Sequence, residues 1–164
     1  MPATARKGAT EENRGGDRTI AVNKRAFHDY LIHETVEAGL VLTGTEIKSI
    51  RAGKVNLREA YAKAEPDAVY LHNMHVAQYD LGNRWNHEPT RVRKLLLHRD
   101  QIRDLGRKTK SKGLTLVPVR LYIKRDRAKI ELAVAQGKKV YDKRQAMAER
   151  EAEREIERTV KVRR

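Results

Sequence analysis

Several residue types are scarce in this sequence of 164 residues, and each scarcity excludes a class of protein. There is no cysteine, which excludes a disulfide framework and a zinc site built on thiolates. Aromatic residues make up only 5% of the chain. No apolar run approaches the roughly 18 residues that predict a transmembrane helix. The first residues also lack the apolar stretch of a signal peptide, so we expect a cytoplasmic protein with no membrane partner.

Sequence motifs for catalysis are missing as well. We find no Gly-rich phosphate loop and no nucleophile placed beside a base. The six histidines are scattered, and the closest pair, His72 and His75, lies on a predicted strand. A separation of three places two strand residues on opposite faces, where they cannot share a metal ion. The sequence therefore predicts no enzyme, no cofactor and no metal site.

The chain does contain a large excess of positive charge. It has 36 Lys and Arg residues against 22 Asp and Glu residues, a formal net charge of +14 and a pI near 10.2. Such an excess favours a polyanionic partner, of which nucleic acid is the first candidate. A membrane surface fits less well, because no long basic helix has a broad apolar face.

Three regions follow from the distribution of apolar residues along the chain. Residues 1–18 are almost free of apolar side chains and predict a disordered lead. Residues 19–136 alternate apolar and polar side chains and predict the folded domain. Residues 137–164 form a basic, highly charged tail whose apolar stripe is thin. An isolated helix of about 20 residues is marginal in water, so we expect this tail to be disordered when free and helical when bound.

The folded region predicts strands joined by short connections. Two hairpins stand out, one turning at residues 65–67 and one around Asp126. Gly39 is expected to mark a turn or bulge within the apolar run of residues 31–42. Many short antiparallel strands predict a mainly β fold, an OB-like barrel of about six strands with two or three short flanking helices.

The short helices are predicted from their end signals. Asn23 is placed to cap a helical turn over residues 24–30. Thr43 and Glu46 have the spacing of a capping box, and Gly53 is a natural stop for the helix that they begin. A third helix is expected to end at Gly106, followed by a mobile basic loop.

A set of basic residues on the folded region is expected to face outward and to bind phosphate. These residues are Lys24, Arg25, Lys48, Arg51, Lys54, Arg120, Lys124 and Lys129. Phe27, Tyr30 and Tyr122 lie among them and predict rings that stack on exposed bases. The alternative is a solvated basic face whose aromatic residues belong to the rim of the core.

Several segments resemble, in order, those of the small protein B family, the SsrA-binding proteins of bacterial trans-translation. They are IAVNKRAFHDY, EAGLVLTGTEIKSIRAGKVN, PTRVRKLLL, VPVRLYIKRDRAKIELAVAQGKK and DKR. The resemblance implies an OB-like barrel without catalytic activity that binds the tRNA-like domain of transfer-messenger RNA. It also implies delivery of the aminoacylated RNA, together with elongation factor Tu, to stalled ribosomes. The tail would then enter the messenger channel beside the small-subunit decoding site and fold into a helix.

The resemblance also implies roles for individual residues. The family's RNA-binding positions fall on Asn23, Lys24, Glu37, Arg51, Leu96 and Lys129; the outward-facing Tyr30, Lys48 and Lys124 extend this set. An acidic residue such as Glu37 is useful at an RNA surface only as a hydrogen-bond acceptor, so it would specify rather than attract.

The tail positions expected to contact the ribosome are Lys138, Lys139, Tyr141, Asp142, Lys143, Arg144 and Ile156. Tyr141 stands where relatives often carry histidine, and the tail lacks the tryptophan common in the family. Two other interpretations of the basic charge remain open: a ribosome-associated chaperone of structured RNA, and a non-specific architectural DNA-binding protein. The match of several motifs in order favours the SsrA-binding function.

Overall fold

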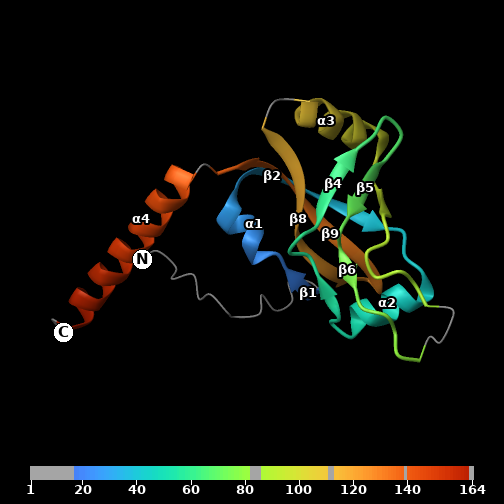
Figure 1. Cartoon of the computed structure of the whole chain (residues 1–164), viewed down its shortest axis with the longest axis horizontal. Helices are drawn as coiled ribbons and strands as arrows, with labels where there is room; N and C mark the ends of the chain where they lie inside the picture. Colours follow the sequence, from blue (N-terminus) through green and yellow to red (C-terminus); the bar gives the residue numbers. More distant parts are fainter. Residues whose placement is uncertain (1–16, 82–85, 111–112, 139, 163–164) are drawn as a thin grey trace.

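The computed structural model describes residues 17–81, 86–110, 113–138 and 140–162 (Figure 1). Within them the chain forms mainly antiparallel β-structure with flanking helices. The strands are β1 (Arg18–Val22), β2 (Tyr30–Leu40), β3 (Val55–Asn56), β4 (Tyr61–Ala64), β5 (Val69–His72), β6 (His75–Val76), β7 (Arg93–Leu96), β8 (Leu114–Lys124) and β9 (Arg127–Gly137). The helices are α1 (Lys24–Asp29), α2 (Gly44–Arg51), α3 (Arg99–Lys110) and α4 (Val140–Val162).

Six strands form a nearly closed ring. They follow the order β8-β4-β5-β7-β2-β9, and β9 pairs with β8 to complete the circle. The junction between β4 and β8 has the fewest register pairs, with the single pair Ala62 and Leu116. β1 lies outside the ring on β8, and β3 pairs separately with β6. The prediction of an antiparallel ring of about six strands is confirmed, and β1, β3 and β6 are additional short strands among the described residues.

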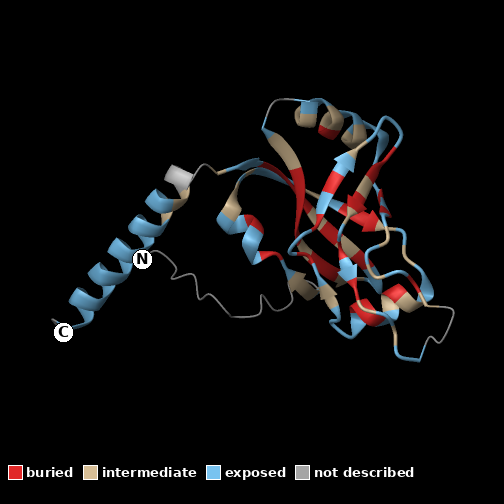
Figure 2. Ribbon diagram, in the orientation of Figure 1, coloured by how far each residue is buried: buried red, intermediate tan, exposed pale blue. Residues whose placement is uncertain are grey.

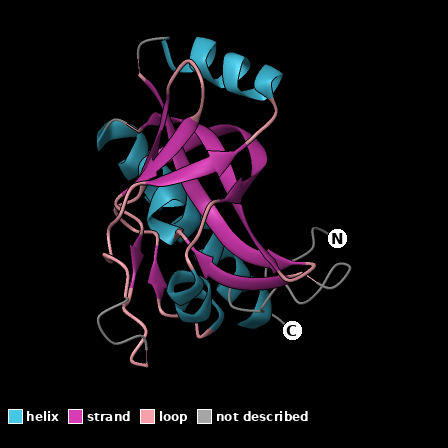
Figure 3. Cartoon of the chain, turned by 90° about the vertical axis from the view of Figure 1, so that its right-hand side faces the viewer, coloured by secondary structure: helices cyan, strands magenta, loops and turns pink. Residues whose placement is uncertain are grey.

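The main core fills the inside of the ring. Leu71, Leu116, Leu121, Ile130 and Leu132 are completely buried there, where their strands alternate inward and outward. The ends of the barrel are covered by helices: Ile50 of α2 and Leu105 of α3 belong to the same core. Figures 1 and 3 show α2 and α3 at opposite ends of the barrel.

A second, smaller core holds α1 against the outside of the barrel. Ala26 of α1 packs on Val117 and Val119 of β8 and on Ala133 and Ala135 of β9. β8 and β9 are therefore buried on both faces along part of their length, as the red segments of Figure 2 indicate. α4 has no such cover: Figure 2 shows it projecting from the barrel with exposed residues along its length.

Most local predictions are confirmed. Asn23 caps α1, the Thr43–Glu46 capping box opens α2, and Gly53, with φ +76°, follows the end of α2. Both predicted hairpins form, β4–β5 and β8–β9. The turn of the second hairpin has positive φ at Arg125 and Asp126, as a tight hairpin turn requires.

Two predictions based on glycine are wrong. Gly39 marks neither a turn nor a bulge, because it lies inside the continuous strand β2, whose irregularity falls between Ile32 and Glu34. Gly39 instead permits close packing, since a Cβ atom there would lie 3.2 Å from the Cβ atom of Leu96 on β7. Gly106 does not end α3 either, and the helix continues to Lys110, so part of the predicted basic loop is helical. Residues 111–112 of that loop lie outside the described residues.

The predicted region boundaries remain predictions, and residues 1–16 of the predicted lead lie outside the described residues. β1 begins at Arg18, the last residue of the predicted lead. β9 extends to Gly137, the first residue of the predicted tail. The prediction that the tail is disordered when free is wrong, because α4 is helical from Val140 to Val162 without a partner. None of the described helices is long and apolar enough to cross a membrane.

Candidate nucleic-acid interface

Asn23 fixes α1 on the barrel. Its side chain is buried, with 4% of the residue exposed. Its Nδ2 atom donates hydrogen bonds to the carbonyl oxygens of Leu57 (3.1 Å) and Pro118 (2.9 Å), and its Oδ1 atom accepts one from the amide of Ala26 (3.2 Å). Both amide protons are therefore committed to the protein. In this structure Asn23 joins α1, β8 and the segment after β3, and it presents little surface to a ligand.

Three residues predicted to contact RNA, Lys24, Phe27 and Tyr30, lie on α1 or directly after it. Lys24, the first residue of the helix, is exposed. Phe27 is 49% exposed, which leaves its ring available at the surface. Tyr30 follows the helix at the start of β2, where it packs at the edge of the smaller core and is partly exposed. α1 thus presents a cation and an aromatic ring beside the outer face of β8.

A polar cluster occupies the outer face of β2, β8 and β9 next to α1. The hydroxyl of Tyr122 on β8 donates a hydrogen bond to Oε2 of Glu37 on β2, across the intervening strand β9. The Lys124 ammonium lies 3.7 Å from the same oxygen, and Lys129 of β9 pairs in register with Tyr122. The hydrogen bond from Tyr122, followed by the charges of Lys124 and Lys129, lowers the pKa of Glu37. Glu37 is therefore an ionised acceptor held in place among cations.

Tyr122 has a different role from the one expected for it. The residue is 3% exposed, so its ring is not a platform for a base. The guanidinium of Arg120 lies over this ring, 4.4 Å from its centroid, and Arg120 Nε also contacts Glu131 Oε2 at 3.2 Å. Burial and the nearby Glu37 carboxylate raise the pKa of Tyr122, so the phenol keeps its proton and remains a donor. The prediction that Tyr122 stacks on a base is wrong.

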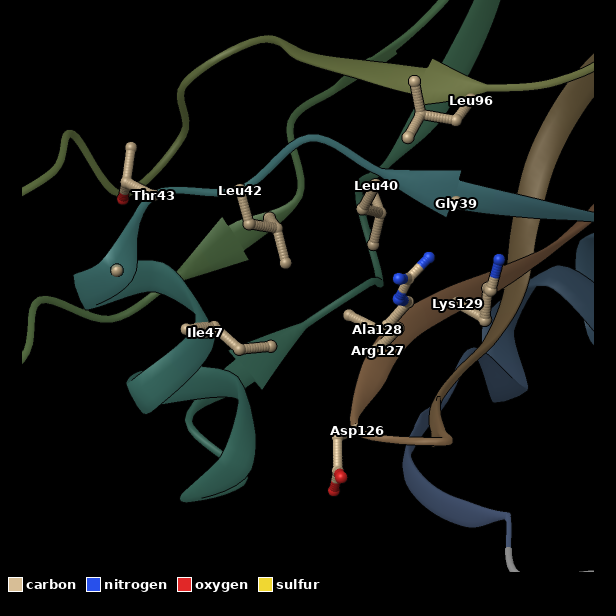
Figure 4. Close-up of a pocket in the computed structure, with 11 residues that line it drawn as sticks. Gly39, Leu40, Leu42, Thr43, Ile47, Leu96, Asp126, Arg127, Ala128 and Lys129 are labelled. Atoms are coloured by element: carbon tan, nitrogen blue, oxygen red, sulfur yellow. The ribbon is translucent and has the colours of Figure 1, made fainter.

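A groove lies beside the polar cluster, where β2 and β7 end near α2 (Figure 4). Its volume is about 320 Å³. Eleven residues line it: Gly39, Leu40, Leu42, Thr43, Gly44, Ile47, Leu96, Asp126, Arg127, Ala128 and Lys129. Leu96 is 54% exposed, an unusual degree for a leucine in a strand of the ring. The groove thus combines apolar walls with the charged residues of the β8–β9 turn.

α2 adds cations near the same end of the barrel. The Arg51 guanidinium donates a hydrogen bond of 3.4 Å to the carbonyl oxygen of Asp126 in the β8–β9 turn, and its own carbonyl accepts one of 2.7 Å from Arg18. These contacts tie the end of α2 to the turn that borders the groove. The ammonium of Lys48, by contrast, lies over the ring of Tyr79, 5.3 Å from its centroid. Lys48 therefore faces the segment after β6 rather than the polar cluster.

The structure thus places the predicted RNA-binding residues in three groups. Glu37, Lys124 and Lys129 form the polar cluster, and Lys129 and Leu96 both line the groove. Lys24 and Tyr30 lie at α1, with Asn23 buried beneath it. Lys48 is separate. Sequence analysis did not predict that Arg127 lines the groove or that Tyr122 orients Glu37. The position of Arg127 directly after the hairpin turn is the sequence feature that could have identified it.

The base of the tail lies against α1. Lys138 donates its backbone N–H to the Asp29 carbonyl (2.9 Å) and its ammonium to the Phe27 carbonyl (3.4 Å), while the Lys143 ammonium lies 3.3 Å from Asp29 Oδ1. Arg144 and Ile156 are exposed on α4. Lys139 lies outside the described residues, and only the backbone of Tyr141 and Asp142, at the start of α4, is described.

No group of three or more histidine, cysteine or acidic residues able to hold a metal ion occurs among the residues that the structure describes. The interface consists instead of cations, one oriented carboxylate and an apolar groove. Such a combination suits a partner with a phosphate backbone and polar base edges.

Comparison with known proteins gives a consistent result. Residues 20–162 match the family model described as SmpB protein. The chain is 60% identical to the SsrA-binding protein of Geobacillus kaustophilus over 150 residues, which cover 92% of this chain and 97% of that protein. It is 55% identical to the SsrA-binding protein of Carboxydothermus hydrogenoformans over 147 residues, 90% of this chain and 99% of that protein.

A solved structure is similar as well. It is described as "tmRNA-SmpB: a journey to the center of the bacterial ribosome". The match has a TM-score of 0.65 at 47% identity and covers 77% of this chain and 93% of the solved chain. The similarity to these proteins therefore extends over both sequence and fold.

Proposed function

The chain belongs to the SmpB family of SsrA-binding proteins, and from that premise we propose that it binds the tRNA-like domain of transfer-messenger RNA and takes it to stalled ribosomes. The observation that carries the proposal is the 60% identity to an SsrA-binding protein over 92% of the chain. The protein acts in trans-translation by binding, not by catalysis. Its partners are transfer-messenger RNA and the ribosome, and it works in the cytoplasm, where ribosomes are.

The barrel supplies the RNA-binding part of this function. The six-stranded ring serves as an OB-like platform, with the polar cluster and the groove on one side. Lys24, Arg51 and Lys129 bind phosphates and release counterions. Glu37 accepts hydrogen bonds from a base edge or a 2′-hydroxyl, for which its orientation by Tyr122 is the support. Leu96 makes the apolar contact at the mouth of the groove.

Asn23 contributes to RNA binding through α1. Its buried amide bonds Leu57, Pro118 and Ala26, so its loss would release the helix that carries Lys24. We therefore assign Asn23 an indirect role, in which it places a neighbouring cation rather than touching RNA with its side chain. Tyr30 and Lys124 complete the surface beside α1, and Lys48 extends it near α2.

The tail supplies the ribosomal part of the function. Lys138, Lys139, Lys143 and Arg144 form a cationic strap along ribosomal RNA, and Tyr141 stacks on a base of the small-subunit decoding site. Asp142 lies in the first turn of α4, where the helix dipole favours an acidic residue. Ile156 faces the wall of the messenger channel. The tail enters the messenger channel as the helix α4, which is already formed without a partner, and the aminoacylated RNA arrives with elongation factor Tu. The exposed surface of α4 supports this proposal, because the barrel buries little of it.

A competition experiment tests the RNA-binding proposal. Labelled transfer-messenger RNA is bound by the protein and displaced with unlabelled transfer-messenger RNA, ordinary tRNA or duplex DNA at one salt concentration. We expect the unlabelled cognate RNA to displace the label at the lowest concentration. Equal displacement by tRNA would favour a general chaperone of structured RNA, and equal displacement by duplex DNA would favour an architectural DNA-binding protein. Either result would contradict the proposal.

Variants then separate attraction from specificity. Lys129→Ala should reduce the slope of log K against log salt by about one unit, because one phosphate contact is lost. Glu37→Ala should instead reduce the preference for transfer-messenger RNA over tRNA. Lys63→Ala, an exposed change on β4, is the control for general charge. Tighter cognate binding by Glu37→Ala would show that this carboxylate only repels RNA.

A further inference from the structure

A chain of alternating charges connects the barrel, α1 and α4. Arg25 of α1 contacts Glu59, in the segment before β4, through Nη1. Arg25 Nε also lies 3.1 Å from Asp29 Oδ2. The other oxygen of Asp29 lies 3.3 Å from the ammonium of Lys143 on α4 and 2.8 Å from His28 Nδ1. Asp29 is therefore the single acidic residue through which α1 holds the first turns of the tail among the described contacts.

Backbone contacts fix the same junction. The pairing of β2 with β9 ends at Tyr30 and Gly137, and the next amide, that of Lys138, donates to the Asp29 carbonyl at 2.9 Å. The Lys138 ammonium reaches the Phe27 carbonyl at 3.4 Å. These carbonyls belong to the C-terminal end of α1, where the helix dipole favours a cation. The tail thus leaves the barrel at a point held by main chain, and its direction is held by side chains.

The side-chain contact matters because little else restrains α4. Met147, Ile156 and Val160 are at least half exposed, so the helix has no apolar seat on the barrel along these positions. A helix of 23 residues at about 1.5 Å per residue extends roughly 35 Å. A small change in the angle at the base of α4 therefore moves its far end by several ångströms, which is about the pitch of an α-helix.

We propose that Asp29 is a positioning residue that sets the direction in which the tail leaves the RNA-binding barrel. Its carboxylate orients Lys143, and through Lys143 the first turns of α4, relative to α1 and the interface beside it. Hydrogen bonding from His28, with the partners Arg25 and Lys143, lowers the pKa of Asp29 to about 2, so the carboxylate is charged under all physiological conditions. The effect of Asp29 on tagging rests on the proposed function, whereas its effect on the direction of α4 does not.

The contact also suits exchange for a ribosomal partner. A partly exposed ion pair is weak, so an RNA phosphate can replace Asp29 as the partner of Lys143 at small cost. Asp29 would then guide the tail before engagement without holding it afterwards. The arrangement keeps the strap cation beside α1 until RNA is available.

The absence of cysteine makes the geometry directly measurable. Cysteines introduced by Glu65→Cys in the β4–β5 turn and Glu153→Cys on α4 accept spin labels at two exposed sites. Pulsed electron–electron distance measurements on the full-length protein then give the distribution of barrel–tail distances. Asp29→Asn should broaden this distribution, and Lys143→Gln, which breaks the same contact from the other side, should broaden it similarly. Asp80→Asn, which affects the exposed pair with Lys54, is the matched control and should leave it unchanged.

Tagging of stalled nascent chains supplies the functional measurement. Asp29→Asn should lower the tagging rate by about two- to fivefold, because loss of a partly exposed ion pair shifts the population of correctly directed tails by no more than that factor, while cognate RNA affinity stays within about twofold. Asp29→Glu should restore most of the rate. An unchanged distance distribution in both variants would overturn the proposal, as would a loss of RNA affinity in parallel with tagging. Failure of the unaltered protein to prefer transfer-messenger RNA would instead overturn the proposed function and leave the distance test standing.

Discussion

The side chain of Tyr122 performs two tasks at once. Its ring is buried on the outer face of β8 beneath Arg120, and its hydroxyl reaches Glu37 on β2. The hydrogen bond spans β9 and so links β2 with β8. It also fixes the one carboxylate of the interface cluster that faces two lysines. Without this bond the Glu37 side chain would be drawn toward the cations, and the position of its carboxylate would be less defined.

Tyr122→Phe tests this role. The substitution keeps the ring and removes one hydrogen bond to a charged group, so the free energy of unfolding should fall by about 1–2 kcal/mol. The preference for transfer-messenger RNA over tRNA should fall in the same direction as in Glu37→Ala, as measured by competition binding. Tyr70→Phe, on the outer face of β5, is the control. Full selectivity in Tyr122→Phe, with selectivity lost in Glu37→Ala, would show that the hydroxyl does not orient the carboxylate.

Glu46 has a structural role of comparable importance. It is completely buried, and its carboxylate contacts buried Arg93 (Nε–Oε1, 3.0 Å), Arg91 (Nη2–Oε2, 2.8 Å) and the backbone N–H of Thr43 (2.9 Å). Burial alone would raise the pKa of Glu46, but the hydrogen bonds from Arg91 and Thr43 outweigh it and lower the pKa. The carboxylate therefore remains ionised and neutralises a guanidinium that has no access to solvent.

Glu46→Ala should consequently be among the most destabilising single changes in the barrel. It leaves Arg93 charged and buried, a condition that costs about 3–5 kcal/mol. Urea unfolding followed by circular dichroism measures the loss. Asp80→Ala removes a carboxylate from the exposed pair with Lys54 and should cost no more than about 1 kcal/mol. A similar loss of unfolding free energy in Glu46→Ala and Asp80→Ala would mean that burial does not increase the contribution of Glu46 to stability.

At the scale of elements, α2 and α3 show what local sequence can and cannot predict. The ends of α2 follow from Thr43, Glu46 and Gly53, because the capping box and the positive φ depend on neighbouring residues alone. α3 continues past Gly106, where Lys108 contacts Asp104 one turn earlier and Glu34 of β2. The contact with Glu34 joins residues 74 apart in the sequence, so no local signal reports it, and together these contacts offset the unfavourable helix propensity of one glycine.

Gly106 and Gly113 differ in backbone conformation, so substitution by alanine should change stability in opposite directions. Gly106 is helical, and a Cβ atom added there would meet no heavy atom within 4 Å, so Gly106→Ala should raise the free energy of unfolding by about 0.5–1 kcal/mol. Gly113 has φ +87°, where an L side chain is strained, so Gly113→Ala should lower it by at least a similar amount. Thermal unfolding of both variants measures the effects. Stabilisation by both would contradict the assigned conformation of Gly113.

The strand β2 shows the limit of pattern reading for the interface. The alternation of its residues reverses at the irregularity between Ile32 and Glu34, so Tyr30 and Glu37 lie on the same outer face although their spacing is odd. A strict period of two would place them on opposite faces. Family resemblance therefore predicts Glu37 where the pattern does not, whereas its partner Tyr122, 85 residues away, becomes evident only from the fold.

At the scale of the whole molecule, the barrel and the tail are built differently. The barrel closes on itself around one main core, and α4 extends from it with few buried residues. Folding of the barrel should therefore not require the tail. The division drawn from the sequence at residues 136 and 137 lies near this transition, although the last strand pairing includes Gly137 and the next main-chain contact includes Lys138.

Truncation after Lys138 tests this independence. The shortened protein retains every strand of the ring, so its unfolding should remain cooperative and its affinity for transfer-messenger RNA should stay within about tenfold, or roughly 1.4 kcal/mol. Tagging of stalled nascent chains should be lost. Gel-shift titration and a tagging assay on the same preparation provide the two measurements. A larger loss of affinity would place part of the tail in the RNA-binding site.

The position of β9 has a consequence for solvent exchange. This strand is flanked by β2 and β8, and Ala133 and Ala135 near its end are buried beneath α1. Amide protons at its centre can reach deuterated water only when the ring opens, whereas those of α4 exchange through fraying of a single helix. One deuterium-uptake profile therefore contains both a reference that tracks global opening and a reporter that tracks the tail. If ribosomes slow deuterium uptake in α4 and leave uptake in β9 unchanged, the time at which α4 becomes protected is the time at which the tail enters the ribosome.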